Sequence, residues 1–427
     1  MTAPWVAALE DLASRLELPV GGLGWRGPGT GLVSPLPVEA LAMGSVGVAG
    51  LAAARWRGID PGGVVVDAAR VGATFRGDQL VTVGGERVAG FAPLSGFWRA
   101  TDGWVRTHAN YPHHRARLVE ALGTEDVAAA VAERSARDVE DAVTAAGGIA
   151  VAVRSRAGWN AHPQGRAVGV EPLVSVRRRE RRGRPAPSRP RVLDLTRVVA
   201  GPVATRTLAL LGADVLRVDP PGLPELAGQH VDTGPGKRTT VLDAASPRFT
   251  ELVDGADVVV TGYRPGALDR FGLDPEALLA RRADLVVVRL DAWGWSGPWA
   301  GRRGFDSIVQ AACGVAAAHA RDGRPGALPA QALDHATGYL AAASALIGLA
   351  ERGERGGSVR ELALARTAEW LFGAPFAKAG AIDGEPELQT LGDVRLPPPP
   401  LVVPGAPDRW TRTAHPLGAD AAAWLAR

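Results

Sequence analysis

The second half of the chain alternates short apolar segments with helical segments, and this pattern constrains the fold more than any other feature. The apolar segments are Arg191–Thr196, Ala213–Val218, Asp257–Thr261 and Asp284–Leu290. Nearly continuous apolar strands that alternate with helices are typical of a parallel sheet that is covered by helices on both faces. We therefore predict an α/β fold in which a ligand binds at the carboxyl ends of the strands.

The part of the chain before this alternation predicts a smaller α+β domain. Helices are expected over Trp5–Leu16 and Glu39–Trp56, and the Asp102-Gly103 turn predicts a β-hairpin. An arginine- and proline-rich run then reads as a linker. We divide the chain into a small α+β domain with leading helices at 1–176, a linker at 177–190, the sheet domain at 191–380 and a closing segment at 381–427.

Composition and charge exclude several classes of function. The 427 residues, 46% of them hydrophobic, suffice for two globular domains, and a net charge of +3 gives no support to nucleic-acid binding. The single cysteine, Cys313, excludes a disulfide framework and a multi-cysteine metal site. The apolar run 38–54 is shorter than the roughly 20 residues of a membrane span. We expect a cytoplasmic protein without a signal peptide, a membrane segment or a metal.

Three histidines, His108, His113 and His114, cluster in the small domain. Their spacing does not supply a set of converging metal ligands. We expect His113 and His114 to begin a helix as solvated or partner-facing residues.

Basic residues recur in turns near the ends of the predicted strands. Arg217, the pair Lys237 and Arg238, and Arg264 each occupy such a turn. One basic residue alone is usually a surface charge, but three such turns at one edge of a sheet favour a polyanionic ligand. The first strand lacks Gly-x-Gly-x-x-Gly, which argues against a nicotinamide dinucleotide.

Asp334 is the residue on which the functional interpretation depends. It lies in Leu328-Pro-Ala-Gln-Ala-Leu-Asp-His-Ala-Thr-Gly-Tyr-Leu340, at the start of a long apolar helix with small residues beside it. An aspartate before a helix is commonly an N-cap, and a carboxylate beside small residues is also placed to meet a substrate. Both readings remain open from these residues alone.

Several segments together resemble the class III coenzyme A transferases, the relatives of formyl-CoA and carnitine-CoA transferases. They are Arg191-Val-Leu-Asp-Leu-Thr-Arg-Val-Val-Ala-Gly-Pro202, Leu211-Gly-Ala-Asp-Val-Leu-Arg-Val-Asp219, Gly236-Lys-Arg238, Tyr263-Arg-Pro-Gly-Ala-Leu268 and Gly294-Trp-Ser-Gly-Pro-Trp299. The resemblance runs from about residue 191 to residue 371. It implies a large Rossmann-like domain, a smaller α+β domain and a homodimer of two interlocked chains.

The resemblance also assigns roles. Asp334 falls on the catalytic aspartate of the family, which attacks an acyl-CoA thioester and carries the CoA as an aspartyl thioester. The coenzyme A contacts fall on Val198, Ala200, Gly201, Pro202, Arg217, Lys237, Arg238, Arg264 and Phe305. Coenzyme A is then a substrate rather than a permanent cofactor. The backbone N–H groups after Asp334 are the expected oxyanion donors.

Two other functions remain open. Acyl-CoA racemases of the same family use a histidine where this chain has Phe305, and phenylalanine cannot move a proton. His335 is a possible substitute, although neighbouring residues of a helix point in different directions. The transferase is therefore favoured over the racemase. The second alternative is a CoA-binding subunit without turnover.

The order of the segments departs from the family. The small domain, which normally follows the large one, comes first, and Leu36-Pro-Val-Glu-Ala-Leu-Ala42 repeats the pattern of Leu328–Asp334. The chain thus looks like the back half of one copy joined to the front half of another. Because Ala42 takes the place of the aspartate, we expect one active centre per chain. The glycine-rich covering loop of the family has only Gly84-Gly85 as a candidate, which reads more simply as a hairpin turn.

Overall fold

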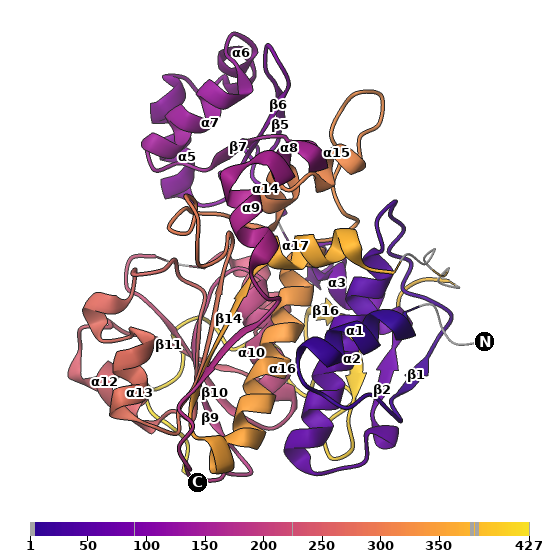
Figure 1. The fold of residues 1–427 in the computed structure, drawn as a ribbon, viewed down its shortest axis with the longest axis vertical. Helices are drawn as coiled ribbons and strands as arrows, with labels where there is room; N and C mark the ends of the chain where they lie inside the picture. Colours follow the sequence, from indigo (N-terminus) through magenta and orange to yellow (C-terminus); the bar gives the residue numbers. More distant parts are fainter. Residues whose placement is uncertain (1–4, 89, 224, 376–379, 381–383, 427) are drawn as a thin grey trace.

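A seven-stranded sheet forms the centre of the large domain (Figure 1). The computed structural model describes residues 5–426 except 89, 224, 376–379 and 381–383. In sheet order the strands are β11 (Arg238–Val241), β10 (Asp214–Asp219), β9 (Arg191–Leu195), β12 (Val258–Thr261), β13 (Val286–Asp291), β14 (Ser358–Ala363) and β8 (Ser175–Arg178). All are parallel except β8, which pairs antiparallel with β14. The six parallel strands have the doubly wound order 3-2-1-4-5-6, so the predicted Rossmann-like sheet is confirmed.

Helices cover both faces of this sheet because the strands are apolar on both sides. Along β12, Val258 and Val260 belong to the core shared with α10 and α16, whereas Val259 faces α12 and α13. The helices of this domain are α10 (Ala200–Leu210), α11 (Ala227–Thr233), α12 (Pro247–Gly255), α13 (Pro275–Arg281), α14 (Asp306–Ala312), α15 (Val315–Ala318), α16 (Ala332–Arg355) and α17 (Leu364–Gly373), with a 3-10 turn at Asp269–Phe271.

The N-terminal segment packs on the large domain and not on the small one. Helix α2 (Val38–Arg57) lies along α16, and both belong to the same core (Figure 1). Strand β2 (Val65–Asp67) pairs with β1 (Gly24–Arg26) and with β17 (Leu401–Val402), near the other end of the chain. The remaining elements are α1 (Val6–Arg15), a 3-10 turn at Pro61–Gly63, α3 (Ala68–Phe75) and α4 (Gly77–Leu80).

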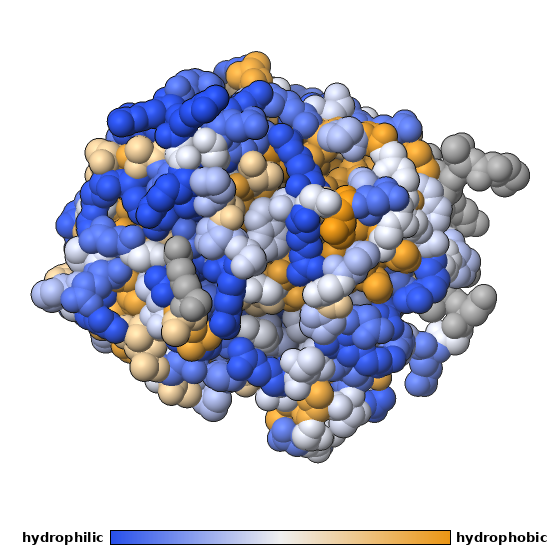
Figure 2. Space-filling model, turned by 90° about the horizontal axis from the view of Figure 1, so that it is seen from below, coloured by the Kyte–Doolittle hydropathy of each residue, from blue (hydrophilic) through white to orange (hydrophobic). Residues whose placement is uncertain are grey.

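Helix α2 is long and apolar enough to cross a membrane when length and hydropathy alone are considered. However, 94% of its apolar window is buried inside the protein, as in a core helix. The molecular face seen in Figure 2 is mainly hydrophilic, with apolar residues appearing between the polar ones.

The compact α+β unit covers only part of the predicted 1–176 domain. Its sheet is β5 (Phe97–Arg99), β6 (Trp104–Thr107) and β7 (Ala150–Ala152), and its helices are α5 (Pro112–Leu122), α6 (Val127–Ala132) and α7 (Ala136–Ala145). These elements have a core of their own and project from the large domain (Figure 1). Helices α8 (Arg156–Ala161) and α9 (Pro163–Val170) lead back to the large sheet.

The predicted linker and closing segment are both partly structured. Residues 177 and 178 belong to β8, where Arg178 pairs with Glu351 of α16, so the linker begins as an edge strand. The closing segment supplies β15 (Gln389–Leu391) and β16 (Val394–Leu396), which pair with β3 (Thr82–Val83) and β4 (Glu86–Arg87). Residues 381–383 of that segment lie outside the described residues.

The small residues beside Asp334 allow α16 to approach α10 closely. A Cβ atom on Gly338 would lie 2.5 Å from the carbonyl oxygen of Ala200 and 2.9 Å from Cβ of Val203. Gly338→Ala is therefore expected to lower the free energy of unfolding by about 1 kcal/mol or more, because overpacking outweighs the gain in helix propensity. Urea denaturation measures it. Gly169→Ala in α9, where a Cβ meets nothing within 4 Å, is the control and should lose no stability.

Candidate active site

Asp334 is a buried residue in the first turn of α16, but it is not the helix cap. The N-cap position belongs to Gln331, and Asp334 is the third helical residue. Its backbone N–H donates to Oδ2 of Asp306 at 2.9 Å. Asp306, at the start of α14, therefore accepts a hydrogen bond from a backbone N–H group in the first turn of α16. The side chain of Asp334 is not needed to cap the helix.

Asp334 and Asp306 both have raised proton affinities, and the charge of Asp306 contributes to that of Asp334. Burial, followed by the neighbouring Asp306, raises the pKa of Asp334 well above its usual value. Burial raises the pKa of Asp306 to about 6, against hydrogen bonds from the backbone of Asp334 and from Gln310 that favour its charged form. Asp306 thus has the donors that stabilise an anion, and Asp334 is the member of the pair that holds a proton in the resting site.

This arrangement predicts a shift in pH dependence for Asp306→Asn. A reaction that needs ionised Asp334 is lost as the pH falls through the raised pKa of that carboxyl group. Asparagine keeps an oxygen for the N–H of Asp334 but removes the like charge, which lowers the pKa of Asp334. The acid limb of the kcat/KM profile should therefore move to lower pH. An unchanged limb would contradict this coupling, whatever happens to the maximal rate.

Asp334 lies at the junction of two pockets, together with Val198 and Phe305, which also line both. The inner pocket has a free volume of about 50 Å³. The outer pocket has about 310 Å³ and reaches the carboxyl ends of β9, β12 and β13 through Arg197, Gly262 and Asp291. This is the topological switch point of the sheet, where doubly wound folds bind ligands.

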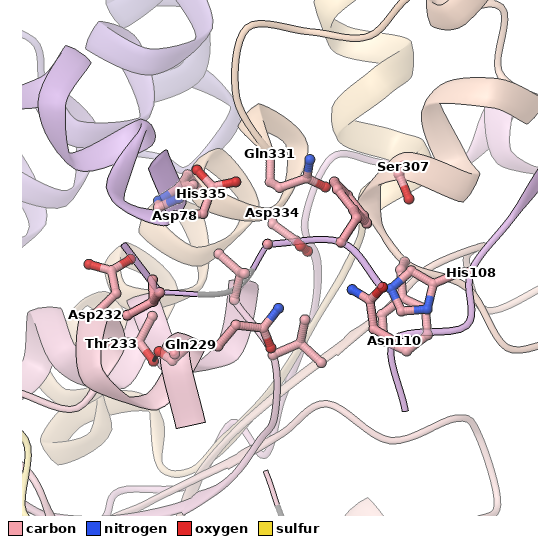
Figure 3. Close-up of a pocket in the computed structure, with 17 residues that line it drawn as sticks. Asp78, His108, Asn110, Gln229, Asp232, Thr233, Ser307, Gln331, Asp334 and His335 are labelled. Carbon is pink, nitrogen blue, oxygen red and sulfur yellow. Dashed lines mark hydrogen bonds between the residues drawn. The ribbon is translucent and has the colours of Figure 1, made fainter. Parts of the chain in front are cut away.

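The inner pocket has a mainly apolar lining that also carries several polar side chains, which come from distant parts of the sequence (Figure 3). Its polar residues are Asp78, His108, Asn110, Gln229, Asp232, Thr233, Ser307, Gln331, Asp334 and His335. Oδ1 of Asn110 accepts from the N–H of Ala92 at 3.0 Å and from Oγ of Ser95 at 2.7 Å. These bonds fix the amide orientation, so that the Asn110 amino group points toward Asp334 in Figure 3.

His108, His114 and His335 are buried and neutral. This corrects the prediction that His114 is a solvated or partner-facing residue. His113 is exposed, as expected, but His114 is buried, and His108 stacks on Phe305 with ring centroids 4.0 Å apart. Burial lowers the pKa of His108, of His114 and of His335 to about 3. Among the described residues no group of His, Cys, Asp and Glu is placed to hold a metal ion.

The outer pocket carries a cluster of arginines. Arg264 and Arg303 are both exposed, and among the described residues neither forms an ion pair. Burial, followed by the neighbouring charge of Arg264, lowers the pKa of Arg303. Two neighbouring guanidinium groups that form no ion pair among the described residues suit a phosphate group.

Four of the nine predicted coenzyme A contacts reach the pockets. Val198, Ala200, Arg264 and Phe305 line them. Gly201 and Pro202 are buried in the first turn of α10, where a Cβ on Gly201 would lie 2.3 Å from Thr196. The pockets described above are not lined by these two residues.

The predicted phosphate ligands Arg217, Lys237 and Arg238 are internal instead. Lys237 is 1% exposed and donates to Asp194, to Thr205 and to the carbonyl of Pro202. Arg238 pairs with Asp214 at 2.9 Å. Their charges neutralise buried carboxylates within the fold, so they are not presented to a ligand.

Arg217 supports the site indirectly. It pairs with Glu225 at 2.9 Å, and Oε2 of Glu225 accepts from the N–H of Val198 at 2.9 Å. Val198 has a φ of 70°, which a β-branched residue rarely adopts. The buried Arg217–Glu225 pair thus holds strained backbone at the point where the two pockets meet.

The second copy of the motif, around Ala42, is buried and forms no active site. Residues that follow the predicted Gly84-Gly85 turn line the inner pocket. Ala42 is completely buried in the core. Gly84 and Gly85 form the two-residue turn between β3 and β4, with φ values of 60° and 88°. Val88, Gly90 and Phe91, which follow this hairpin, line the inner pocket.

Comparisons with known proteins find similarity mainly over the large domain. Residues 190–401 match the family model described as CoA-transferase family III. The chain is 34% identical over 213 residues to a protein named acetyl-coenzyme A transferase nodX from Hypoxylon pulicicidum, covering 47% of this chain and 34% of that protein. It is 36% identical over 185 residues to the probable fatty acyl-CoA transferase Rv3272 from Mycobacterium tuberculosis, covering 39% of this chain and 47% of that protein.

A crystal structure of Rv3272 is similar to this chain with a TM-score of 0.40 and 32% identity, over 44% of this chain and 58% of that one. The chain spans less than half the length of the two curated relatives.

Proposed function

We propose that the protein is a CoA transferase of family III, whose model matches residues 190–401, and that it moves coenzyme A between an acyl-CoA thioester and a carboxylic acid through Asp334. The observation that carries the proposal is the position of Asp334 at the junction of a small inner pocket and a wider cationic pocket. An acyl group in the inner pocket and coenzyme A in the outer pocket bring the thioester carbon to the carboxyl group between them.

The chemistry divides one difficult exchange into steps. The carboxylate of Asp334 attacks the thioester carbonyl, which forms a mixed anhydride and releases the CoA thiolate. The thiolate then attacks the aspartyl carbonyl, giving an aspartyl-CoA thioester and the free donor acid. The acceptor carboxylate attacks this thioester and releases the thiolate again, which takes the acyl group from the new anhydride and frees Asp334. Because burial and Asp306 raise the pKa of Asp334, the attack requires prior loss of its proton, and the N-terminal end of α16 stabilises the carboxylate that results.

The proposed oxyanion donor is the side chain of Asn110. The N–H groups after Asp334, which the sequence favoured, are engaged inside the helix, and that of His335 donates to the carbonyl of Gln331 at 3.1 Å. Asn110 faces Asp334 across the inner pocket with its amino group forward (Figure 3). A donor held by two hydrogen bonds on its own oxygen is preorganised for a developing negative charge.

Arg264 and Arg303 are the proposed contacts for the phosphates of coenzyme A. Replacing either by alanine is expected to raise the KM for acyl-CoA by about tenfold with kcat nearly unchanged, because a charge-assisted hydrogen bond is lost in ground state and transition state alike. Steady-state kinetics measure it. Arg270→Ala removes an exposed arginine that lies outside both pockets and should leave KM unchanged. A fall in kcat with constant KM would contradict the assignment.

Trapping of the covalent intermediate tests the proposed function. The protein is incubated with an acyl-CoA and quenched with hydroxylamine, which converts an aspartyl thioester or anhydride into a hydroxamate. We expect mass spectrometry to find the hydroxamate on the peptide that contains Asp334, and to find none in Asp334→Ala. A donor that binds yet leaves no hydroxamate would favour a CoA-binding subunit without turnover.

A racemase is the second candidate, and His335 is the observation that favours it. His335 lines the inner pocket beside Asp334, although the two are neighbours in sequence, and burial keeps its imidazole neutral by lowering its pKa to about 3. A neutral imidazole and a protonated carboxyl group could exchange a proton at the acyl α-carbon. Deuterium from solvent entering that carbon without transfer of coenzyme A would support the racemase and count against the transferase.

A further inference from the structure

We propose that the inner pocket selects a short acyl chain that carries a hydroxyl group. The inference rests on the proposed function, because it assigns this pocket to the acyl group of the thioester. It names a substrate class that differs from the fatty acyl group in the name of Rv3272.

The size of the inner pocket restricts the chain length. The 50 Å³ of the inner pocket is a few times the roughly 10–15 Å³ that a single water needs, and about a sixth of the volume of the outer pocket. The inner pocket therefore suits an acyl chain of roughly two to four carbons better than a fatty acyl chain.

The walls of the pocket hold polar atoms that lack a partner within the described part of the chain. Oδ1 of Asp78, Oε1 of Gln229, Nδ1 of His108 and Nδ1 of His335 are buried and accept or donate no hydrogen bond there. His108 and His335 are only 3% and 2% exposed. A buried polar group without a partner is destabilising, so an acyl chain that supplies partners is preferred to an alkyl chain of the same shape.

The charges around these atoms distinguish among polar acyl chains. Asp78 and Asp232 lie close together, since a Cβ atom on the adjacent Gly77 would be 2.5 Å from Oδ2 of Asp232, and Asp232 is paired with Arg206 at 3.0 Å. Asp334 adds a third carboxyl group to the same pocket. The carboxylates outnumber the single arginine, which disfavours a second carboxylate on the acyl chain.

The mixture of donors and acceptors favours a hydroxyl over an ammonium group. A neutral imidazole donates from one nitrogen and accepts at the other, whereas carboxylate and amide oxygens only accept. A hydroxyl group donates to one neighbour and accepts from another, and so satisfies both kinds of wall atom. An ammonium group has no acceptor to offer.

The test compares binding of matched thioesters to the Asp334→Asn protein, which cannot consume them. The probes are butyryl-CoA, 3-hydroxybutyryl-CoA, 3-aminobutyryl-CoA, succinyl-CoA and octanoyl-CoA, measured by calorimetry. We expect 3-hydroxybutyryl-CoA to bind at least about tenfold more tightly than butyryl-CoA. Equal binding of these two, or tightest binding of the amino, succinyl or octanoyl thioester, overturns the inference.

Variants of Asp78 locate the preference. Asp78→Ala and the isosteric Asp78→Asn, each combined with Asp334→Asn, should bring the ratio of the two dissociation constants toward one. Glu133→Gln, which changes an exposed carboxylate far from this pocket's lining, should keep it. Retention of the full ratio in both Asp78 variants overturns the assignment of the hydroxyl to this wall.

The hydroxamate experiment separates this inference from the proposed function. A hydroxyacyl preference without a hydroxamate on wild-type Asp334 leaves the pocket assignment standing and overturns the transferase. A hydroxamate from butyryl-CoA and 3-hydroxybutyryl-CoA alike, with equal dissociation constants, supports the transferase and overturns the pocket assignment. Failure of all five thioesters to bind overturns both.

Discussion

Replacement of Asp334 by asparagine is expected to reduce CoA transfer by at least about 10⁴-fold, because it removes the only group on which the covalent intermediate is proposed to form. Asparagine has nearly the same shape, and the N–H that donates to Asp306 belongs to the backbone, so the first turn of α16 should be preserved. The rate of transfer from an acyl-CoA to a second acid measures the effect.

Binding and folding controls show whether the loss of transfer in Asp334→Asn reflects the missing nucleophile or a damaged fold. The Asp334→Asn protein should unfold at the same denaturant concentration or a higher one, since a buried carboxyl group with a raised pKa is removed. Its affinity for acyl-CoA should be retained. Transfer at more than a hundredth of the wild-type rate, by a variant shown by mass spectrometry to be free of deamidation, would contradict the nucleophilic role.

The second large effect is expected for Asn110. Asn110→Asp should lower kcat by about 10²–10³-fold with a much smaller change in KM, which is the usual cost of losing one oxyanion donor. Aspartate retains the oxygen that accepts from Ala92 and Ser95, and therefore keeps the loop in place while replacing the amino group by an acceptor.

Ser95→Ala is the matched control for this position. It removes one of the bonds that orient Asn110, from Oγ of Ser95, but leaves the amino group present. A modest loss is expected for Ser95→Ala and a large one for Asn110→Asp. Equal losses in both variants would mean that Asn110 acts only by holding the loop, and that the oxyanion donor lies elsewhere.

The doubled motif has a structural consequence that fits a self-contained chain. The helix that carries Asp334 packs along α2, the helix that carries Ala42, inside one polypeptide. The resemblance to the family implied that two interlocked chains bring the corresponding front and back halves together. We propose that the rearranged order lets one chain supply both halves, with a single catalytic carboxyl group.

The strands of the large domain were predictable because each is a short apolar run between helical segments. β9, β10, β12 and β13 fall within one or two residues of the predicted segments, since burial on both faces makes most positions of such a strand apolar. Strands β8, β11 and β14 were missed. Edge strand β8 is arginine-rich, and its arginines pair with carboxylates such as Glu351 and Glu361 that are distant in sequence.

The roles of the cations could not be assigned from sequence. Lys237 and Arg264 both follow the pattern of a basic residue in a turn near a strand end, yet Lys237 is buried against Asp194 and Arg264 faces the outer pocket. Lys237 is a structural cation because Asp194, 43 residues earlier in the chain, lies next to it in the fold. Charge and spacing contain no such information.

The sequence by itself determined the parallel sheet and the candidacy of Asp334, and it predicted the edge at which a ligand is expected to bind, because these follow from local apolar periodicity and from a specific set of motifs. The tertiary structure alone decided what surrounds Asp334. Asp306 meets the backbone of Asp334, and His108 and Asn110 reach the inner pocket, only when α14, the segment after β6 and α16 have packed together. Proton affinity, oxyanion stabilisation and acyl selection depend on burial and on distances between such residues, which exist only in the folded chain.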